Sequence, residues 1–283
     1  MKILVTGFRG FTGRYVSPTL SNSGHEVIGL ASNLNDYEAL AAEIKELKPQ
    51  AVIHLAAIAF VGHGNANDLY NVNLLGTRNL LEALSHVSSS VEHVLLASSA
   101  NIYGNASEGE LDELTPANPA NDYAVSKYAM EMMANLWVER LPISIVRPFN
   151  YTGIGQDEKF LIPKIVSHFK QKKAVIELGN LDVWREFNDV RFVAKMYSHI
   201  ISGPPSVSGQ CVNICTGKAY SLREVITLCE KITDHKIDIQ VNPEFIRANE
   251  VKVLKGSDAK LKQLVGTDGL YELEETLRWM LIN

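Results

Sequence analysis

A tyrosine and a lysine stand four residues apart in the stretch NDYAVSKYAME, residues 121–131. Among the ten tyrosines of the chain, only Tyr123 has a lysine, Lys127, at this distance. Four residues are about one helical turn, so both side chains are expected on one face of a helix. A nearby ammonium lowers the pKa of a tyrosine from about 10, which would permit acid–base chemistry near neutral pH. For this stretch alone, the alternative interpretation is a pair without a catalytic role, namely a half-buried tyrosine beside a lysine whose ammonium extends to solvent.

A second candidate site lies at the start of the chain, where TGFRGFTG places Gly7, Gly10 and Gly13 three residues apart. The glycines follow an apolar run, residues 2–7, that predicts a buried strand, and they precede a predicted helix, residues 11–22. Such glycines permit a tight turn, the approach of a diphosphate to the backbone and the packing of helix on strand. The helix N-terminus adds free N–H groups. The spacing predicts a dinucleotide site, with a plain turn as the alternative.

The elements that must position these groups alternate as far as Asn150. Apolar runs that predict strands occupy residues 2–7, 25–31, 51–57, 93–100 and 142–150. Segments with helical periodicity occupy residues 11–22, 36–48, 68–87 and 121–140. This alternation predicts an α/β fold with a Rossmann-like, doubly wound parallel sheet.

After Asn150 the alternation stops. Helical patterns then occupy residues 160–173, 189–202 and 221–233, and β-like runs occupy residues 210–217 and 236–241. We therefore expect a smaller, interleaved substrate-binding lobe. The predicted division gives residues 1–150 to the dinucleotide-binding domain, returns residues 174–217 to it, and gives residues 151–173 and 218–283 to the smaller lobe.

Composition narrows the class of protein. Hydrophobic residues are 46% and charged residues 21%, as in soluble globular proteins, and the net charge of −5 argues against a nucleic-acid partner. The cysteines, Cys211, Cys215 and Cys229, form no CxxC pair, which fits free thiols, a reducing compartment and no metal site. No apolar run approaches the roughly 20 residues of a membrane span, and no signal sequence opens the chain. We expect a cytoplasmic protein without a membrane partner.

Six short motifs occur in order along the chain: GxxGxxG, HLAA (54–57), NVNLLGT (71–77), SSANIYG (98–104), YAVSK (123–127) and RPFN (147–150). Together they resemble the extended short-chain dehydrogenase/reductase family of nucleotide-sugar epimerases, dehydratases and reductases. The resemblance covers nearly the whole chain and implies a nicotinamide cofactor and a catalytic triad. In this triad Tyr123 protonates the alkoxide formed by hydride transfer, Lys127 positions the ribose and tunes Tyr123, and Ser99 bonds to a substrate oxygen.

The resemblance also implies a set of cofactor contacts. They are Gly7, Arg9, Gly10, Phe11, Gly13, Asn33, Leu34, Leu55, Ala56, Ala57, Tyr123, Lys127 and Pro148. An acidic residue at the end of the second strand is typical of NAD binding, but none occupies residues 31–33. Asn33 and Leu34 resemble the remnant of an Asp-Leu pair, so the strand that usually precedes this pair is expected to be missing or minimal. Arg9 could reach a 2′-phosphate, which favours NADP(H), with NAD(H) as the alternative.

The residues after Ser99 bear on the type of reaction. The 4,6-dehydratases of the family have an Asp-Glu pair there, whereas this chain has Ala100 and Asn101, so dehydration is not expected. Related reductases commonly have glutamate at the position of Asn101, and this departure bears on how a keto-sugar would be oriented. Substrate contacts are expected at Ser99, Asn101, Asn150, Arg185, Arg247 and Glu250.

Three later segments, residues 149–166, 179–197 and 246–261, resemble GDP-4-keto-6-deoxy-mannose reductases, which make GDP-rhamnose. In that resemblance the guanidinium forks of Arg185 and Arg247 bind the nucleotide diphosphate. The implied activity is the NAD(P)H-dependent reduction of a nucleotide-linked 4-keto-6-deoxy sugar. A nucleotide-sugar epimerase that retains NAD, a substrate with another base, and a non-catalytic dinucleotide-sensing regulator remain as alternatives.

Relatives of this kind form dimers through the helices expected at residues 68–87 and 121–140. The second helix carries surplus apolar side chains, namely Met132, Met133, Leu136 and Trp137. They would either join the core or pair with a second copy. We expect a homodimer.

Overall fold

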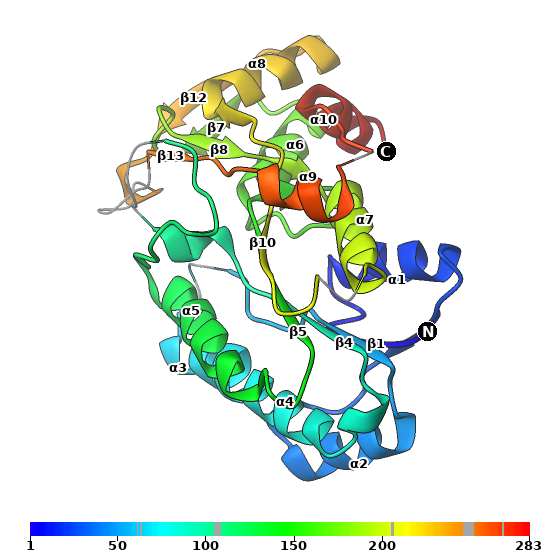
Figure 1. Ribbon diagram of the computed structural model, residues 1–283. Coiled ribbons are helices and arrows are strands. Elements are labelled where there is room, and N and C mark those ends of the chain that lie inside the picture. Colours follow the sequence, from blue (N-terminus) through cyan, green and yellow to red (C-terminus); the bar gives the residue numbers. More distant parts are fainter. Residues whose placement is uncertain (61, 63, 105–108, 205–206, 246–251, 268) are drawn as a thin grey trace.

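A six-stranded parallel sheet forms the larger part of the molecule (Figure 1). The structure is a computed structural model and describes all residues except 61, 63, 105–108, 205–206, 246–251 and 268. In spatial order the strands are β10 (Cys211–Ile214), β5 (Ile143–Pro148), β4 (His93–Ala97), β3 (Ala51–His54), β1 (Lys2–Thr6) and β2 (Glu26–Gly29). Every neighbouring pair is parallel. The predicted Rossmann-like fold is confirmed, and its strand order reverses between β1 and β3, where such sheets bind ligands.

Helices cover both faces of this sheet because its strands alternate their side chains between two apolar cores. Ile3 and Val5 pack with one set of helices, and Leu4 packs with the other. The first set is α1 (Gly13–Asn22), α7 (Val190–Ile201) and α9 (Ala259–Val265). The second set is α2 (Tyr37–Leu47), α4 (Thr77–Ser85) and α5 (Asp122–Ala134). Among the described residues, none of the helices is long and apolar enough to cross a membrane.

Two expected helices differ from the structure in detail, whereas the connection after β2 agrees with the prediction. No strand lies between β2 and α2, so β2 is an edge strand, as the short connection predicted. The helix expected at residues 68–87 is divided into α3 (Ala66–Tyr70), a π-helical turn (Asn71–Gly76) and α4. The helix expected at residues 121–140 stops at Ala134 and continues as a 3₁₀ turn (Asn135–Trp137). A π-helical turn inside a helix often marks a functional site.

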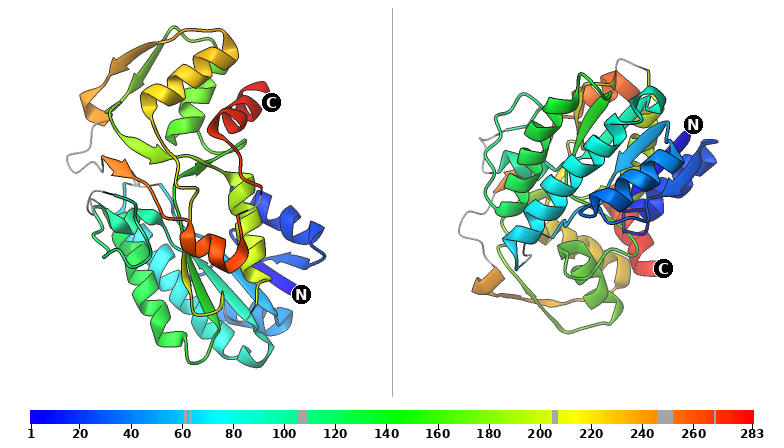
Figure 2. Two further views of the ribbon diagram at one scale, coloured as in Figure 1. Left: turned by 45° about the horizontal axis from the view of Figure 1, so that its top comes forward. Right: turned by 90° about the horizontal axis from the view of Figure 1, so that it is seen from below.

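The smaller lobe stands at one end of the large sheet (Figure 2). Its helices are α6 (Leu161–Lys170), α8 (Leu222–Thr233) and α10 (Leu273–Ile282). Its strands are β7 (Val175–Leu178), β8 (Trp184–Glu186), β11 (Ala219–Ser221), β12 (Asp238–Val241) and β13 (Val253–Leu254), arranged as β11–β8–β13 and β12–β7. Within residues 174–217, α7 and β10 therefore lie on the large sheet. The strands β7 and β8 pair in the smaller lobe, where Ile176 and Leu178 join a separate apolar core.

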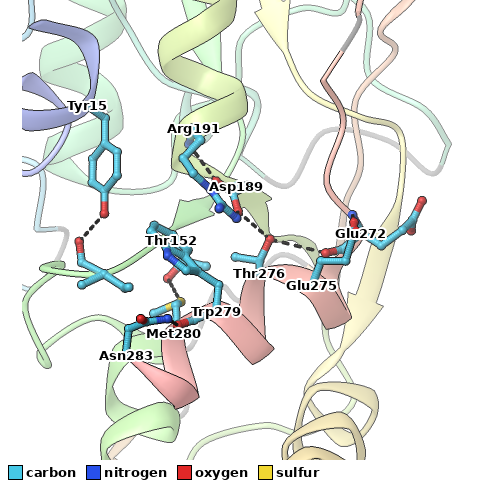
Figure 3. Close-up of polar contacts among 11 residues, drawn as sticks. Tyr15, Thr152, Asp189, Arg191, Glu272, Glu275, Thr276, Trp279, Met280 and Asn283 are labelled. Atoms are coloured by element: carbon cyan, nitrogen blue, oxygen red, sulfur yellow. Dashed lines mark hydrogen bonds and ion pairs between the residues drawn. The ribbon is translucent and has the colours of Figure 1, made fainter. Parts of the chain in front are cut away.

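The last helix is fixed to α7 by what we call the α10 clamp: Asp189, Arg191, Tyr271, Thr276 and Trp279. Figure 3 labels Asp189, Arg191, Thr276 and Trp279. The Arg191 guanidinium carbon lies 4.1 Å from the ring centroid of Tyr271 and 3.8 Å from that of Trp279. Arg191 donates to Asp189 through Nε at 2.9 Å and Nη2 at 2.6 Å. The Thr276 hydroxyl donates to the same carboxylate at 2.8 Å. These contacts hold the smaller lobe against the helices of the large sheet.

Candidate active site

The glycine loop turns directly from β1 into α1. Gly7 has a φ of +68°, and the N–H of Gly10 donates to the Gly7 carbonyl at 2.9 Å. A Cβ on Gly7 would lie 2.9 Å from the backbone nitrogen of Ala56, and a Cβ on Gly13 would lie 2.4 Å from the Gly7 oxygen. A side chain at Gly7 or Gly13 would therefore clash with the backbone around this turn. The bare backbone at the point where the strand order reverses fits a dinucleotide diphosphate.

A row of buried hydrogen bonds fixes the end of β3 beside this loop. The Thr6 hydroxyl oxygen accepts the N–H groups of Leu55 and Ala56, both at 3.1 Å, so its own proton is left for His54 Nδ1 at 2.7 Å. His54 Nε2 then donates to the Thr77 hydroxyl at 2.8 Å. Burial lowers the pKa of His54 to about 3, so the ring is neutral. His54 therefore acts as a neutral link between β3 and α4.

Asn73, in the π-helical turn, joins the loop after β3 to α5. Its Oδ1 accepts the N–H of Ile58 at 2.9 Å, and its Nδ2 donates to the Ile58 carbonyl at 3.1 Å and to the Ser126 hydroxyl at 3.0 Å. Ser126 in turn donates to the Tyr123 carbonyl at 2.8 Å. The sequence analysis missed Asn73, although an asparagine within a helical pattern is unfavourable enough to have indicated a special role.

The helix α5 brings Tyr123 and Lys127 to the end of β4. Asn121 caps the helix by accepting the N–H of Ala124 at 2.9 Å. One turn later Lys127 Nζ donates to the Ala97 carbonyl at 2.8 Å, and the Tyr123 hydroxyl lies near Ser99. The side chains of Ser99, Tyr123 and Lys127 are all buried. The sequence-predicted triad is thus gathered at one strand end, and its catalytic role stays a prediction.

Burial controls the protonation of this group. Burial raises the pKa of Tyr123 to about 12, while the nearby Ser99 side chain opposes the shift. Burial lowers the pKa of Lys127 to about 8, and nearby Glu131 opposes that shift. The expectation that Lys127 lowers the pKa of Tyr123 is wrong for this structure, because burial dominates and the ammonium is bonded to Ala97. At neutral pH, Tyr123 is a protonated phenol and Lys127 is mostly charged.

The other predicted cofactor residues lie at the carboxyl ends of four strands of the large sheet. Gly7, Arg9, Gly10, Phe11 and Gly13 follow β1, Asn33 and Leu34 follow β2, Leu55, Ala56 and Ala57 follow β3, and Pro148 ends β5. Arg9 is exposed, as a contact to a 2′-phosphate requires. Leu34 is buried in the core, and its carbonyl accepts a hydrogen bond from Asn79 at 2.9 Å. These strand ends line one edge of the sheet.

An acidic side chain does reach the end of β2, although none was found there in the sequence. Glu43, from α2, accepts the N–H of Ala31 at 2.8 Å and the N–H of Ser32 at 2.7 Å, and it also bonds to the Ser32 hydroxyl. Hydrogen bonds from Ser32 and Ala31 outweigh the opposing effect of burial and keep the pKa of Glu43 below its usual value. Because β2 is an edge strand, this carboxylate serves N–H groups that a further strand would have paired.

The predicted substrate residues come from both lobes. Asn101 donates to the Ser99 hydroxyl oxygen through its backbone N at 3.2 Å and its Nδ2 at 3.1 Å. The carbonyl of Asn150, just after β5, accepts the N–H of Asn188 at 2.8 Å. In β8, Arg185 Nη1 donates to the carbonyls of Trp184 at 2.8 Å and Lys252 at 3.2 Å. The remaining two predicted substrate residues, Arg247 and Glu250, lie outside the described residues.

Comparisons with known proteins agree with this geometry. The chain is 36% identical over 273 residues to GDP-6-deoxy-D-talose 4-dehydrogenase of Aggregatibacter actinomycetemcomitans, covering 95% of this chain and 92% of the relative. It is 31% identical to GDP-6-deoxy-D-mannose reductase of Pseudomonas aeruginosa, covering 99% and 96%.

Two solved structures are similar over almost their full length. A protein from Burkholderia cenocepacia J2315 gives a TM-score of 0.93 at 46% identity, covering 99% of this chain and 97% of that one. The structure of RMD from Pseudomonas aeruginosa complexed with NADPH gives a TM-score of 0.88 at 30% identity, covering 100% and 98%. Residues 3–215 match the model of the NAD dependent epimerase/dehydratase family. The chain therefore belongs to this family, the extended short-chain dehydrogenases, and is an NAD(P)-dependent oxidoreductase.

Proposed function

We propose that this enzyme reduces the 4-keto group of a nucleotide-linked 4-keto-6-deoxy sugar with NAD(P)H. The proposed substrate is GDP-4-keto-6-deoxy-mannose, and the product is GDP-rhamnose or its 4-epimer. The observation that carries the proposal is the gathering of the buried side chains of Ser99, Tyr123 and Lys127 at the end of β4, with Tyr123 one helical turn from Lys127. The two curated relatives, named for GDP-linked 6-deoxy sugars, support the choice of substrate class.

Tyr123 is suited to give a proton. With a pKa of about 12 it stays protonated at neutral pH, and its hydroxyl would protonate the sugar oxygen as negative charge develops there. Ser99 accepts two N–H bonds from Asn101, so its own proton is free to be donated to that oxygen or to Tyr123. When bound, the nicotinamide would supply the hydride.

Lys127 would bind the nicotinamide ribose of the cofactor. An ammonium has three N–H donors, and the bond to Ala97 uses one of them. The others are suited to the hydroxyl groups of the nicotinamide ribose. The Ala97 bond fixes the direction of the side chain, and Asn73 and Ser126 fix the helix that carries it.

The reaction stops at reduction because the two described residues that follow Ser99 offer no base for dehydration. Removal of water from a sugar requires a group that takes a proton from the neighbouring carbon. Ala100 is buried and apolar, and Asn101 is engaged with Ser99. Neither residue can act as that base.

We further propose NADP(H) as the cofactor, with NAD(H) as the alternative. The exposed Arg9 would pair with a 2′-phosphate. Glu43 acts in the opposite direction, because its carboxylate lies at the end of β2, where a 2′-phosphate would add a second negative charge. The relative solved with NADPH supports the first choice.

The apolar face of α5 supports the proposed homodimer. Leu75 of the π-helical turn and Val125, Met132 and Leu136 on and after α5 are 48%, 38%, 47% and 78% exposed. The other two candidate residues, Met133 and Trp137, pack into the core of the chain itself. Light scattering that gives a single 31.3 kDa chain at micromolar concentration would contradict the dimer.

A coupled assay tests the proposed function. GDP-mannose, a GDP-mannose 4,6-dehydratase and this protein are combined with NADPH or NADH, and the absorbance of the reduced cofactor is followed. We expect consumption of the cofactor and a GDP-linked 6-deoxyhexose as product. Conversion of a nucleotide sugar without net consumption would support the epimerase alternative. A UDP-glucose 4-epimerase of Halalkalibacterium halodurans is 27% identical over 98% of this chain.

A further inference from the structure

Tyr151 lies on the first strand after β5, immediately after Asn150, and no role in the site has been given to it so far. It begins β6 (Tyr151–Thr152), which pairs with β9 (Asn188–Asp189) at the junction of the two lobes. Its hydroxyl is 2.7 Å from the hydroxyl of Thr12, a residue of the glycine loop. This contact joins residues 139 positions apart in the sequence.

The ring of Tyr151 is fixed to the same loop. It is stacked on Phe11, with ring centroids 6.0 Å apart and planes inclined by 11°. Phe11 in turn meets Tyr15 edge-on at 5.7 Å. One side chain thus contacts two consecutive residues of the loop, Phe11 through its ring and Thr12 through its hydroxyl.

Thr12 stands at the N-cap of α1 with a helical backbone, at φ −67° and ψ −38°, and its side chain makes no capping hydrogen bond. A capping side chain requires a non-helical backbone at this position. The N–H groups of Arg14 and Tyr15 in the first turn donate to the carbonyls of Gly10 at 3.1 Å and Thr12 at 3.0 Å. The Thr12 hydroxyl is therefore available to Tyr151, and their 2.7 Å contact fixes the glycine loop to β6.

We propose that Tyr151 is a cofactor-positioning residue, which fixes the glycine loop to the junction of the two lobes through Phe11 and Thr12. The inference rests on dinucleotide binding alone and does not depend on the identity of the sugar.

The test is a titration of the purified full-length protein with NADPH and, separately, with NADH, without any sugar, followed by the fluorescence of the reduced nicotinamide. Tyr151→Phe keeps the ring and removes the hydroxyl. We expect its dissociation constant to rise about fivefold, the effect of a lost hydrogen bond. Tyr15→Phe is the matched control, because it also touches Phe11 and loses a 2.7 Å hydroxyl bond, to the Ile154 carbonyl.

A double-mutant cycle with Thr12→Val tests whether Tyr151 acts through the Thr12 hydroxyl or through a general loss of order in the glycine loop. Valine has no hydroxyl to bond to Tyr151, so we expect Tyr151→Phe to cause no further loss of affinity in the Thr12→Val background. The proposal is overturned if Tyr151→Phe binds both cofactors as the unmodified protein does, or if Tyr15→Phe weakens binding equally. An undiminished loss in the Thr12→Val background also overturns it, because Tyr151 would then act on the cofactor directly. Melting temperatures of all variants exclude global unfolding as the cause.

Discussion

The Asp189 carboxylate of the α10 clamp and the Tyr123 site are both buried and polar, but they are built in opposite ways. In the clamp, the Asp189 carboxylate accepts from the backbone and side chain of Arg191 and from Thr276. At the other site, Tyr123 and Lys127 gain too little from hydrogen bonds to offset their burial, and their pKa values move to about 12 and about 8. Compensated burial gives stability, whereas uncompensated burial changes protonation and provides chemistry.

The largest effect is expected from Tyr123→Phe. This change removes the proton donor but keeps the ring, so kcat should fall about 10²- to 10⁴-fold while the affinity for NADPH and the melting temperature stay nearly the same. Tyr70→Phe is a matched control, since it loses an exposed hydroxyl bond to Asp122 at 2.9 Å. Activity of Tyr123→Phe within tenfold of the unmodified enzyme would refute the assignment of the donor.

Mutation of the α10 clamp should lower stability, whereas mutation of Tyr123 should lower activity. Asp189→Asn leaves Arg191 without its carboxylate, and we expect a loss of about 2 kcal/mol in the free energy of unfolding. The estimate is below that for a fully buried pair, because the Arg191 side chain is 30% exposed. Chemical denaturation measures the change. Asp182→Asn, in an exposed pair with Arg223, should change stability by less than about 0.5 kcal/mol. Equal losses in the two variants would remove the distinction.

The pH dependence of kcat/KM sharpens the comparison. Burial places the pKa of Lys127 near 8, so its charge is present below pH 8 and is lost above it. With Lys127 needed in its charged form, kcat/KM should decline about tenfold per pH unit above pH 8. Tyr123 remains protonated through this range and adds no change of its own. A flat profile up to pH 10 would show that the Lys127 charge is not required.

The smallest effects concern cofactor choice. Arg9→Ala should weaken the binding of NADPH about fivefold more than the binding of NADH, because only NADPH has the 2′-phosphate. Glu43→Gln should shift the ratio of affinities toward NADPH, because a negative charge at the end of β2 is removed. Titrations with both cofactors measure the two ratios. An unchanged ratio in Arg9→Ala would remove its proposed role.

Local patterns were enough to predict the large sheet, the glycine loop and the positions of Tyr123 and Lys127. Each depends on residues close together in the sequence, such as Gly7 and Gly13 around one turn or Tyr123 and Lys127 on one helix. Helical periodicity also predicted the bounds of α7 and α8 within one residue and those of α6 within three.

Contacts between distant segments could not be predicted in this way. Glu43 reaches the end of β2 only because the next strand is missing and α2 follows at once. The Tyr151–Thr12 contact and the α10 clamp join residues more than 80 positions apart. The protonation of Tyr123 also depends on burial by the whole fold, which a spacing rule does not contain.

The most direct test of the central claim follows the hydride. The coupled reaction is run with NADPH deuterated at both C4 hydrogens of the nicotinamide, and the GDP-linked product is analysed by mass spectrometry. A reductase must transfer one deuterium to the sugar in every turnover, so we predict a product heavier by one mass unit and a matching amount of oxidised cofactor. An isomerised nucleotide sugar without deuterium, formed without oxidation of the cofactor, would contradict the reductase and show an epimerase.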